Sequence, residues 1–550
     1  MNPLDLVLAV PLVGFLGLLF VPRAAEGAIR TVALIFSLVA FLASLGLALG
    51  YHTDFAGEQW FTDVTWIASP NIHYHVGLDG LSLWLVILTT FLTPVCILIS
   101  WNSIQSRVKE FFALMLLLEF GLAGVFAAQD LFLFYVFWEV SLVPMYFLIG
   151  IWGHDRRIYA ALKFFLYTFA ASVLMLTAII YVYNRAGTFN YSDILAMLAS
   201  GKVSFTGTEQ LALFLAFFVA FAVKVPLFPL HTWLPDAHVE APTAGSVMLA
   251  SVMLKMGTYG LARFCLPMFP GAARLCAPWI VVLAIIGIIY GALVAMVQPN
   301  MKKLVAYSSV SHLGFVVLGI FSFTQLGMDG AVYQMLNHGI STGALFVLVG
   351  FLYDRRHSLA IADFGGVATP APWLSTVFMI TMLASIGLPT LNNFIGEYLV
   401  LQGSAQANFH WTIFAAIGVI LSACYMLWLY QRVFFGETPD EVRDHVFDLK
   451  PREWAVAVPL VAMMVWMGMY SQSFLPVVSK TTAHILDQTQ VNVQFRVRAD
   501  ICPTSLPSVQ QAGGAGASAC QPMLSNLLNV QSPNRAATVR ERSPEVAHAR

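Results

Sequence analysis

Six ionisable side chains stand inside apolar stretches of this 550-residue chain. A charged side chain at the middle of a bilayer costs about 2.5–3.5 kcal/mol on insertion scales. The six residues are Glu139, Lys224, Lys255, His312, His338 and Glu397. Lysine, histidine and glutamate can each hold or release a proton, and burial or a neighbouring charge changes their proton affinity. The pattern therefore predicts a proton relay across the centre of a membrane.

The residue types suggest how such a relay would work. A Glu139–Lys224 pair would let one charge change the proton affinity of the other. From Lys224 a water-linked series would run, in chain order, through Lys255 and the two histidines to Glu397. Arginine could not serve, because it does not deprotonate in proteins. No arginine stands in the middle of an apolar run.

Each of these residues also has a purely structural explanation. A single buried lysine or glutamate can form a structural ion pair, and a buried histidine is often a hydrogen-bonded packing group. Six of them on separate helices favour the relay. Lys163 and Asp130 lie nearer helix ends, where snorkelling or capping explains them as well as a relay role does. His231 and His238 are expected in a short external segment, with a structural role.

The elements that must position these residues are membrane-spanning helices. Hydrophobic residues make up 59% of the chain and charged residues only 10%, against roughly 25% charged in soluble domains. A span needs about 20 mostly apolar residues, and about fourteen such runs occur. They fall near 4–22, 29–50, 79–100, 111–129, 131–151, 158–183, 210–230, 243–265, 278–297, 303–323, 331–352, 373–402, 411–435 and 454–474. The expected fold is an all-α integral membrane protein.

Two of the runs, the seventh and the twelfth, carry helix-breaking residues. The seventh contains Pro226 and Pro229 directly after Lys224, and the twelfth contains Pro389 after Gly387. Proline removes a backbone donor and clashes with the preceding turn. Matched interruptions in two halves of a chain are typical of transporters built from inverted repeats. We therefore expect two inverted five-helix repeats with broken helices 7 and 12.

The expected domain boundaries follow from these runs. The parts are helices 1–3 (1–110), the first repeat with helices 4–8 (111–265), the second repeat with helices 9–13 (275–436), helix 14 (453–475) and a polar tail (480–550). The tail is rich in Pro, Ser, Ala, Gly and Gln, a composition typical of disorder. The first run lacks a basic segment before it and is read as a retained helix.

Basic residues are concentrated in alternate loops. Loops after odd-numbered helices hold Arg23, Arg30, Arg107, Lys109, Arg156, Arg157, Lys302, Lys303, Arg355, Arg356, Arg432, Arg443, Lys450 and Arg452. Loops after even-numbered helices hold only Arg185, Lys202, Arg263 and Arg274. The positive-inside rule then places the odd loops in the cytoplasm and both termini outside. Residues 51–78, without lysine or arginine, form a long external loop.

Composition and motifs exclude several other kinds of chemistry. The net charge of −1 gives no sign of nucleic-acid binding. The sequence has no CxxC pair, dinucleotide-binding fingerprint or Walker loop where it could function, so redox and nucleotide chemistry are expected in other proteins. Four of the cysteines lie in or beside apolar runs without metal-ligand spacing. Cys502 and Cys520 could pair if their side of the membrane is oxidising.

Four segments resemble one protein family. They are FFVAFAVKVPLFPLHTWLPDAHVEAPTAGSVMLASVMLKMGTYG at 217–260, QPNMKKLVAYSSVSHLGF at 298–315, LFLFYVFWEVSLVPMYFLIG at 131–150 and ASIGLPTLNNFIGEYL at 384–399. This set resembles the antiporter-like subunits of respiratory complex I, over about residues 75–475. Two features favour the chain M branch, the counterpart of mitochondrial subunit 4. Glu397 stands where sister subunits typically carry lysine, and the long lateral helix of the largest sister is missing.

The resemblance implies a proton-translocating subunit of NADH–quinone oxidoreductase in the bacterial inner membrane. It implies Glu139 and Lys224 as the coupled pair, Lys255 at the centre, and Glu397 at the exit, with His312 and His338 between. It also implies no redox centre in this chain. NADH, FMN, iron–sulfur clusters and quinone would be handled by the other subunits of the complex, which include sister antiporter-like subunits.

Two alternatives remain open at this stage. The first is a subunit of a multi-subunit sodium/proton antiporter or of a membrane-bound hydrogenase, which share the fold. Neighbouring genes would discriminate, because dehydrogenase and iron–sulfur subunits would favour complex I. The second is a scaffold that only holds other subunits together. It predicts that neutralising Glu139, Lys224 or Lys255 leaves proton pumping intact.

Overall fold

A computed structural model describes residues 2–490 of the chain. Within that part, twelve helices are long and apolar enough to cross a membrane. They are α1 (Pro3–Phe20), α2 (Glu26–Leu49), α3 (Leu83–Ser103), α4 (Val108–Ala127), α5 (Leu131–Trp152), α6 (Arg157–Ala186), α8 (Gly207–Lys224), α13 (Pro270–Met296), α14 (Met301–Ile320), α15 (Gln325–Arg356), α18 (Phe409–Phe434) and α20 (Pro451–Met469). Cys502, Cys520 and the tail from 491 lie outside the described residues.

The other two expected spans are interrupted helices. The eighth is a composite of α10 (Thr243–Met248), the π-helical turn η1 (Leu249–Met253), α11 (Leu254–Gly260), a second π-helical turn η2 (Leu261–Cys265) and α12 (Leu266–Met268). The twelfth is split into α16 (Pro372–Ile386) and α17 (Asn392–Ala407). With these two segments, the structure accounts for the fourteen expected spans.

Both predicted helix breaks are present. Helix α8 stops at Lys224, and the chain resumes as α9 (Trp233–Glu240) after the segment that holds the two prolines. The Trp233 indole donates to the Val223 carbonyl at 2.9 Å and so satisfies a backbone group that the break leaves free. Helix α16 ends at Gly387, whose φ of 85° lies in the left-handed region that favours glycine.

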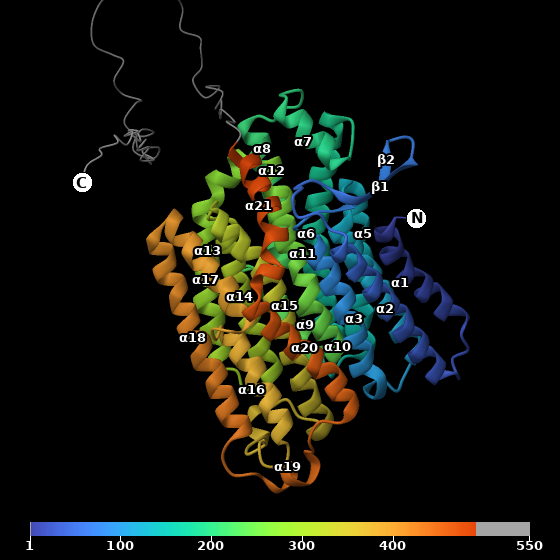
Figure 1. Cartoon of the computed structure of the whole chain (residues 1–550), viewed down its shortest axis with the longest axis vertical. Coiled ribbons are helices and arrows are strands. Elements are labelled where there is room, and N and C mark those ends of the chain that lie inside the picture. The colour runs from blue at the N-terminus through green and yellow to red at the C-terminus, as the bar shows by residue number, and fades with distance from the viewer. Residues whose placement is uncertain (1, 491–550) are drawn as a thin grey trace, which may run out of the picture. The chain divides into compact units, whose positions relative to one another are not determined.

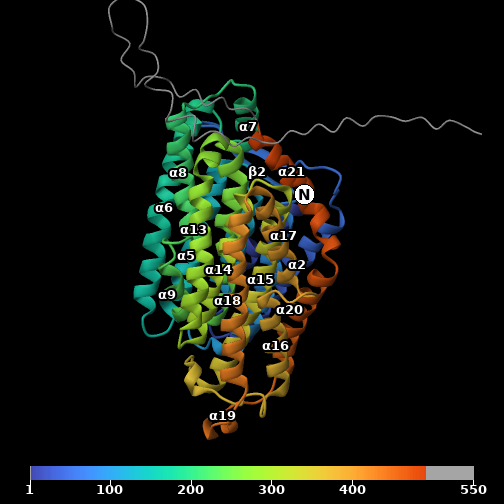
Figure 2. The ribbon, with the colours of Figure 1, turned by 90° about the vertical axis from the view of Figure 1, so that its left-hand side faces the viewer.

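One end of the bundle carries structure that the sequence analysis did not foresee. Residues 51–78 were expected as a loop, but they contain strands β1 (Gln59–Ile67) and β2 (Ile72–Leu78), paired antiparallel with Gln59 opposite Leu78. The short helix α7 (Tyr191–Ala199) lies at the same end. Figures 1 and 2 both place α7 at one end and α19 (Asp440–His445) at the other.

The expected start of the tail at 480 is wrong. Helix α21 (Leu475–Gln490) continues the chain beyond α20, with the short 3₁₀ turn η4 (Ser471–Ser473) between them; another such turn is η3 (Ile361–Asp363). Ser479 and Thr482 of α21 donate hydrogen bonds to Asp329 of α15. Low hydropathy suggested a tail, but the helix buries the apolar side chains Val477, Val478, Ile485 and Leu486 beside these polar contacts.

Burial identifies the centre of the bundle. The apolar window of α15 is 100% buried and that of α14 is 89% buried, whereas α2 is only 28% buried. The outer helices expose apolar side chains such as Leu42 and Leu166, as expected of surfaces that face lipid. The two histidines of the predicted relay therefore stand on the two most buried of these twelve helices.

Candidate functional site

The first predicted pair, Glu139 and Lys224, does not form an ion pair in the described structure. Glu139 on α5 is partly buried, and the Ser172 hydroxyl donates to its carboxylate at 2.5 Å. The Lys224 ammonium ends α8, is 1% exposed, and lies 5.4 Å from the ring centroids of both Trp138 and Phe164. Trp138, whose ring Lys224 faces, directly precedes Glu139 in the chain. The expected contact is thus replaced by cation–π contacts.

Lys255 stands on α11 between the two π-helical turns. Its ammonium, fully buried, donates to the Ala250 carbonyl at 2.6 Å and lies 2.7 Å from Nδ1 of His338. Ala250 belongs to η1, and π-helical turns inside α-helices are frequent at functional sites. A neutral imidazole nitrogen can accept from the ammonium. Lys255 and His338 therefore form a directly hydrogen-bonded pair.

Two histidines connect this pair to the second half of the molecule. The rings of His338 on α15 and His312 on α14 have centroids 5.8 Å apart. His312 Nδ1 lies 2.9 Å from the Glu397 carboxylate on α17, and the Tyr425 hydroxyl lies 3.4 Å from His312 Nε2. The order in space is therefore Lys255, His338, His312, Glu397. The chain order had suggested the opposite order for the histidines.

The break before α17 lets Glu397 reach His312. A side chain on Gly387 would place its Cβ 3.0 Å from the Glu397 carboxylate, so the glycine leaves room for the acid. Asn392 donates to the Asn337 carbonyl at 3.0 Å, and Asn393 donates to the Ser341 hydroxyl at 3.1 Å. These bonds hold the start of α17 against α15. Gln334 adds a donor to Glu397 at 3.2 Å.

His231 and His238 were expected in a short external segment with a structural role, and both are buried. They are 3% and 0% exposed. His238 on α9 stacks on Phe346 with ring centroids 4.6 Å apart, and neither of its ring nitrogens has a partner among the described groups. Lys255 and Lys302 both act on it through space. The burial of His238 could have been predicted from its position in the segment directly after a broken helix.

Buried or partly buried basic groups lie near His238 at the α19 end of the bundle. Lys302 was counted among loop residues, but it is 1% exposed and donates to the Ala241 carbonyl at 2.8 Å. In the loop between α5 and α6, burial and the nearby Lys302 charge lower the pKa of His154 to about 4. The His154 ring is therefore neutral near pH 7, and it lies 3.4 Å from the Tyr353 hydroxyl.

Lys163 and Asp130 lie apart from this row of residues. Lys163 on α6 forms an ion pair with Asp236 of α9 at 2.7 Å. Asp130 caps α5, because its carboxylate accepts from the backbone N–H groups of Phe132 and Leu133 at 2.9 Å. Capping accounts for Asp130, while Lys163 joins α6 to the segment that carries His238.

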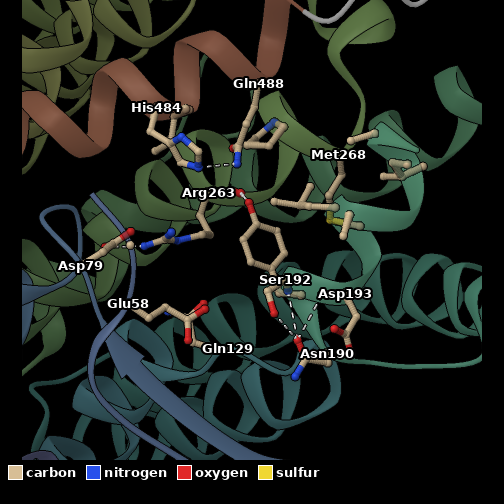
Figure 3. Close-up of a pocket in the computed structure, with 18 of the residues that line it drawn as sticks. Glu58, Asp79, Gln129, Asn190, Ser192, Asp193, Arg263, Met268, His484 and Gln488 are labelled. Carbon is tan, nitrogen blue, oxygen red and sulfur yellow. Dashed lines mark hydrogen bonds and ion pairs between the residues drawn. The ribbon is translucent and has the colours of Figure 1, made fainter. Parts of the chain in front are cut away.

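Three further buried charged residues escaped the sequence analysis. Glu119 on α4 is fully buried, and neither carboxylate oxygen has a partner in the described part of the chain. Arg263 was assigned to a loop, but it lies in η2, is 6% exposed, and pairs with Asp79 at 2.6 Å. The pair lines a cavity at the α7 end (Figure 3). Glu119 could have been predicted as a buried acid, because it stands within the apolar run LLLEFGLAG.

The described residues contain no group of three or more histidine, cysteine, aspartate or glutamate side chains that could hold a metal ion. The four cysteines among them are Cys96, Cys265, Cys276 and Cys424, and all are free. What the arrangement offers chemically is a buried row of groups that can hold protons, enclosed by α8, α11, α14, α15 and α17.

Comparison with known proteins identifies relatives over most of the chain. The family described as "NADH:quinone oxidoreductase/Mrp antiporter, TM" matches residues 128–423. NADH-quinone oxidoreductase subunit M of Rhodobacter capsulatus is 46% identical over 499 residues, which cover 88% of this chain and 96% of the relative. NADH-ubiquinone oxidoreductase chain 4 of Marchantia polymorpha is 42% identical over 481 residues, covering 87% and 96%.

Solved structures share the fold. A chain of respiratory complex I from Thermus thermophilus superposes with a TM-score of 0.81 at 31% identity, covering 88% of this chain and 99% of its own. A chain of the Mrp complex from Dietzia sp. gives 0.78 at 21% identity, covering 89% and 99%. This second likeness concerns the fold alone, whereas the sequence identities favour complex I over the antiporter alternative. The chain therefore belongs to the subunit M family of NADH–quinone oxidoreductase.

Proposed function

We propose that this chain carries protons through the row Lys255–His338–His312–Glu397, and that Glu139 and Lys224 control the charge at its start. As a member of the subunit M family, the chain is a proton-translocating membrane subunit of respiratory complex I. The observation that carries the proposal is the close spacing of these buried groups. The Lys255 ammonium lies 2.7 Å from His338, the two imidazole ring centroids are 5.8 Å apart, and His312 lies 2.9 Å from the Glu397 carboxylate. Every member of the row can take up and release a proton.

Electrostatic coupling between neighbouring lysines would drive transfer. Gly257 of α11 packs on the broken end of α8, where its Cβ would lie 2.7 Å from the Phe221 carbonyl, so the turns that carry Lys224 and Lys255 are adjacent. Like charges in a low-dielectric interior repel strongly. A proton that arrives on Lys224, beside Glu139, would therefore favour release of the Lys255 proton toward His338.

The inverted repeats remain part of the proposal, and the capping pattern supports them. Asp130 starts α5 and bridges to Asn190 after α6, while Asn300 starts α14 and bridges to Ala360 after α15. The first bridge adjoins α7 and the second adjoins η3, toward the α19 end of the bundle. We assign residues 111–265, from α4 to η2, to the first repeat, and residues 275–436, from α13 to α18, to the second.

The proposal includes the setting of the chain. We place it in the bacterial inner membrane, with the α7 end and both termini toward the periplasm and the α19 end toward the cytoplasm. Its partners are the other membrane subunits of complex I, including sister antiporter-like subunits. NADH, FMN, iron–sulfur clusters and quinone are bound by partner subunits, and redox energy reaches this chain through them.

The decisive variant is Glu139→Gln, which keeps the shape of the side chain and removes its charge. In membranes with a fully assembled complex, we expect NADH–quinone electron transfer and proton pumping to fall together, by about tenfold or more. Electron transfer is measured as NADH oxidation and pumping as quenching of a pH-sensitive dye. Glu110→Gln is the matched control, because Glu110 is a surface acid paired with Arg23.

Normal pumping at a normal rate in assembled Glu139→Gln complex would contradict the proposal. It would favour the scaffold alternative, in which neutralising the buried charges disturbs assembly at most. Genes for antiporter subunits beside this one, in place of dehydrogenase and iron–sulfur subunits, would contradict the assignment to complex I.

A further inference from the structure

A large cavity opens at the α7 end of the bundle, separate from the row of proton-holding residues. Its volume is about 950 Å³, and side chains from the β1–β2 hairpin, α7, η2 and α21 line it. Figure 3 shows Asp79 and Arg263 side by side in its wall, with Glu58 and Asp193 on other sides. Apolar side chains make up most of its lining, and Glu58, Asp79, Asp193 and Arg263 lie among them. A cavity of this size has room for water beside such polar groups.

One residue of the cavity wall lies on the same composite helix as Lys255. Arg263 follows Lys255 by eight residues on the same composite helix, a rise of about 12 Å. Tyr259 stands between them, fully buried; its hydroxyl accepts from the Arg263 guanidinium at 3.2 Å and donates to the Phe126 carbonyl at 3.2 Å. About two helical turns thus separate Lys255 from a side chain in the cavity wall.

The Arg263–Asp79 pair is built to stay charged. Asp79 is 4% exposed and accepts from Arg263 at 2.6 Å, from the Ser82 hydroxyl at 2.8 Å and from the Leu81 N–H at 3.1 Å. Arginine does not deprotonate in proteins. The Arg263 side chain in the cavity wall is therefore a fixed cation that can neither release nor transfer a proton.

We propose that Arg263 is the electrostatic barrier that keeps protons of the cavity from reaching Lys255. This inference rests on the proposed function, in which Lys255 belongs to the relay and the cavity faces the periplasm. A fixed positive charge repels protons, as arginine does in water-conducting pores. Without it, protons of the cavity would approach Lys255 along the composite helix, and pumped protons would return along that route. Arg263 is a positioning residue and not a member of the relay.

The test is proton leakage through the whole complex reconstituted in liposomes. In Arg263→Gln, passive proton conductance under a potassium diffusion potential, without NADH, should rise on the order of tenfold, the effect of lowering a barrier by about 1.4 kcal/mol. NADH oxidation should continue, while the protons retained per NADH fall. Unchanged conductance would overturn the proposal. Loss of electron transfer and pumping together, without leakage, would overturn it too and identify Arg263 as part of the relay.

Further variants separate charge from structure. Asp79→Asn breaks the same ion pair but keeps the cation, so these liposomes should stay tight. The double variant Arg263→Gln/Asp79→Asn leaves no unpaired buried charge and should still leak. Leakage in all three variants would indicate simple loosening and contradict the barrier. Arg355→Gln is the control, because it breaks a buried pair with Glu453 at the opposite end.

The same preparation distinguishes this inference from the proposed function. If Glu139→Gln loses pumping and liposomes with Arg263→Gln show unchanged proton conductance, only the barrier proposal is refuted. Glu139→Gln with normal pumping would refute the relay itself, whatever Arg263→Gln shows.

Discussion

Lys255 illustrates how much depends on the type of a single residue. Its ammonium lies between a backbone carbonyl and His338, and no carboxylate within residues 2–490 is hydrogen-bonded to it. An ion pair would hold the proton in place, whereas a neutral imidazole at 2.7 Å offers the proton a second site. The residue is therefore suited to transfer, and charge alone should not be enough for its role.

Lys255→Arg tests that argument. The variant keeps a positive charge but cannot deprotonate, so pumping in assembled complex should fall by about tenfold or more, as far as in Lys255→Met. Native gels check assembly, and dye quenching under NADH measures pumping. If Lys255→Arg pumped normally while Lys255→Met did not, Lys255 would serve only as a fixed charge, and the relay would need another member.

At the scale of elements, irregular helices place the site. The break after Lys224 ends α8 inside the bundle, the π-helical turns flank Lys255, and the break before Asn392 starts α17 near His312. Irregular backbone inside a membrane is tolerated where protein groups satisfy it, as Trp233 does for the Val223 carbonyl. The irregular turns occur next to the ionisable residues of the relay, so they determine where those side chains lie.

The contact of α11 with α8 gives the prediction at this scale. Gly257→Ala would place a Cβ 2.7 Å from the Phe221 carbonyl and 2.9 Å from the Val225 nitrogen. Backbone atoms cannot yield easily, so we expect a loss of about 1–3 kcal/mol in stability and weaker pumping. A lower temperature of thermal inactivation of NADH–quinone activity would show it.

The control for this prediction is Gly46→Ala in α2, where a Cβ meets nothing within 4 Å. The two substitutions add the same methyl group to a helical glycine, and only one of them meets packed backbone. Equal inactivation temperatures for Gly257→Ala and Gly46→Ala would mean that α11 and α8 do not need their close approach.

At the scale of the whole molecule, the two ends of the bundle differ in kind. The α7 end carries the hairpin and the acidic cavity, whereas the α19 end gathers the buried basic groups Lys302 and Arg355. The charge bias of the loops agrees with this division, and it assigns the α19 end to the cytoplasm. The proposed direction of pumping depends on that assignment.

Thiol labelling tests the orientation. In a background with all six cysteines replaced, Lys202→Cys beyond α7 should react with a membrane-impermeant reagent in intact spheroplasts. Asp440→Cys in α19 should react only in inverted vesicles. Both positions are exposed, so access to the reagent depends on the side of the membrane. The reverse pattern would invert the topology and with it the roles of the two ends.

The sequence by itself determined the class of protein, the number of spans, the positions of both breaks and the six ionisable residues inside the apolar runs. These features depend on local chemistry, namely the length of apolar runs, the missing donor of proline and the expense of charge in a membrane. The family resemblance could be read for the same reason, since its motifs are continuous in the chain.

Only the tertiary structure decided which of these groups meet. It placed His338 before His312, left Lys224 over aromatic rings instead of on Glu139, and joined Arg263 to Asp79 across 184 residues. It also formed the hairpin from residues that hydropathy had assigned to a loop. Such contacts depend on helix packing between distant segments, and no local pattern of residue types specifies which face of one helix another will meet.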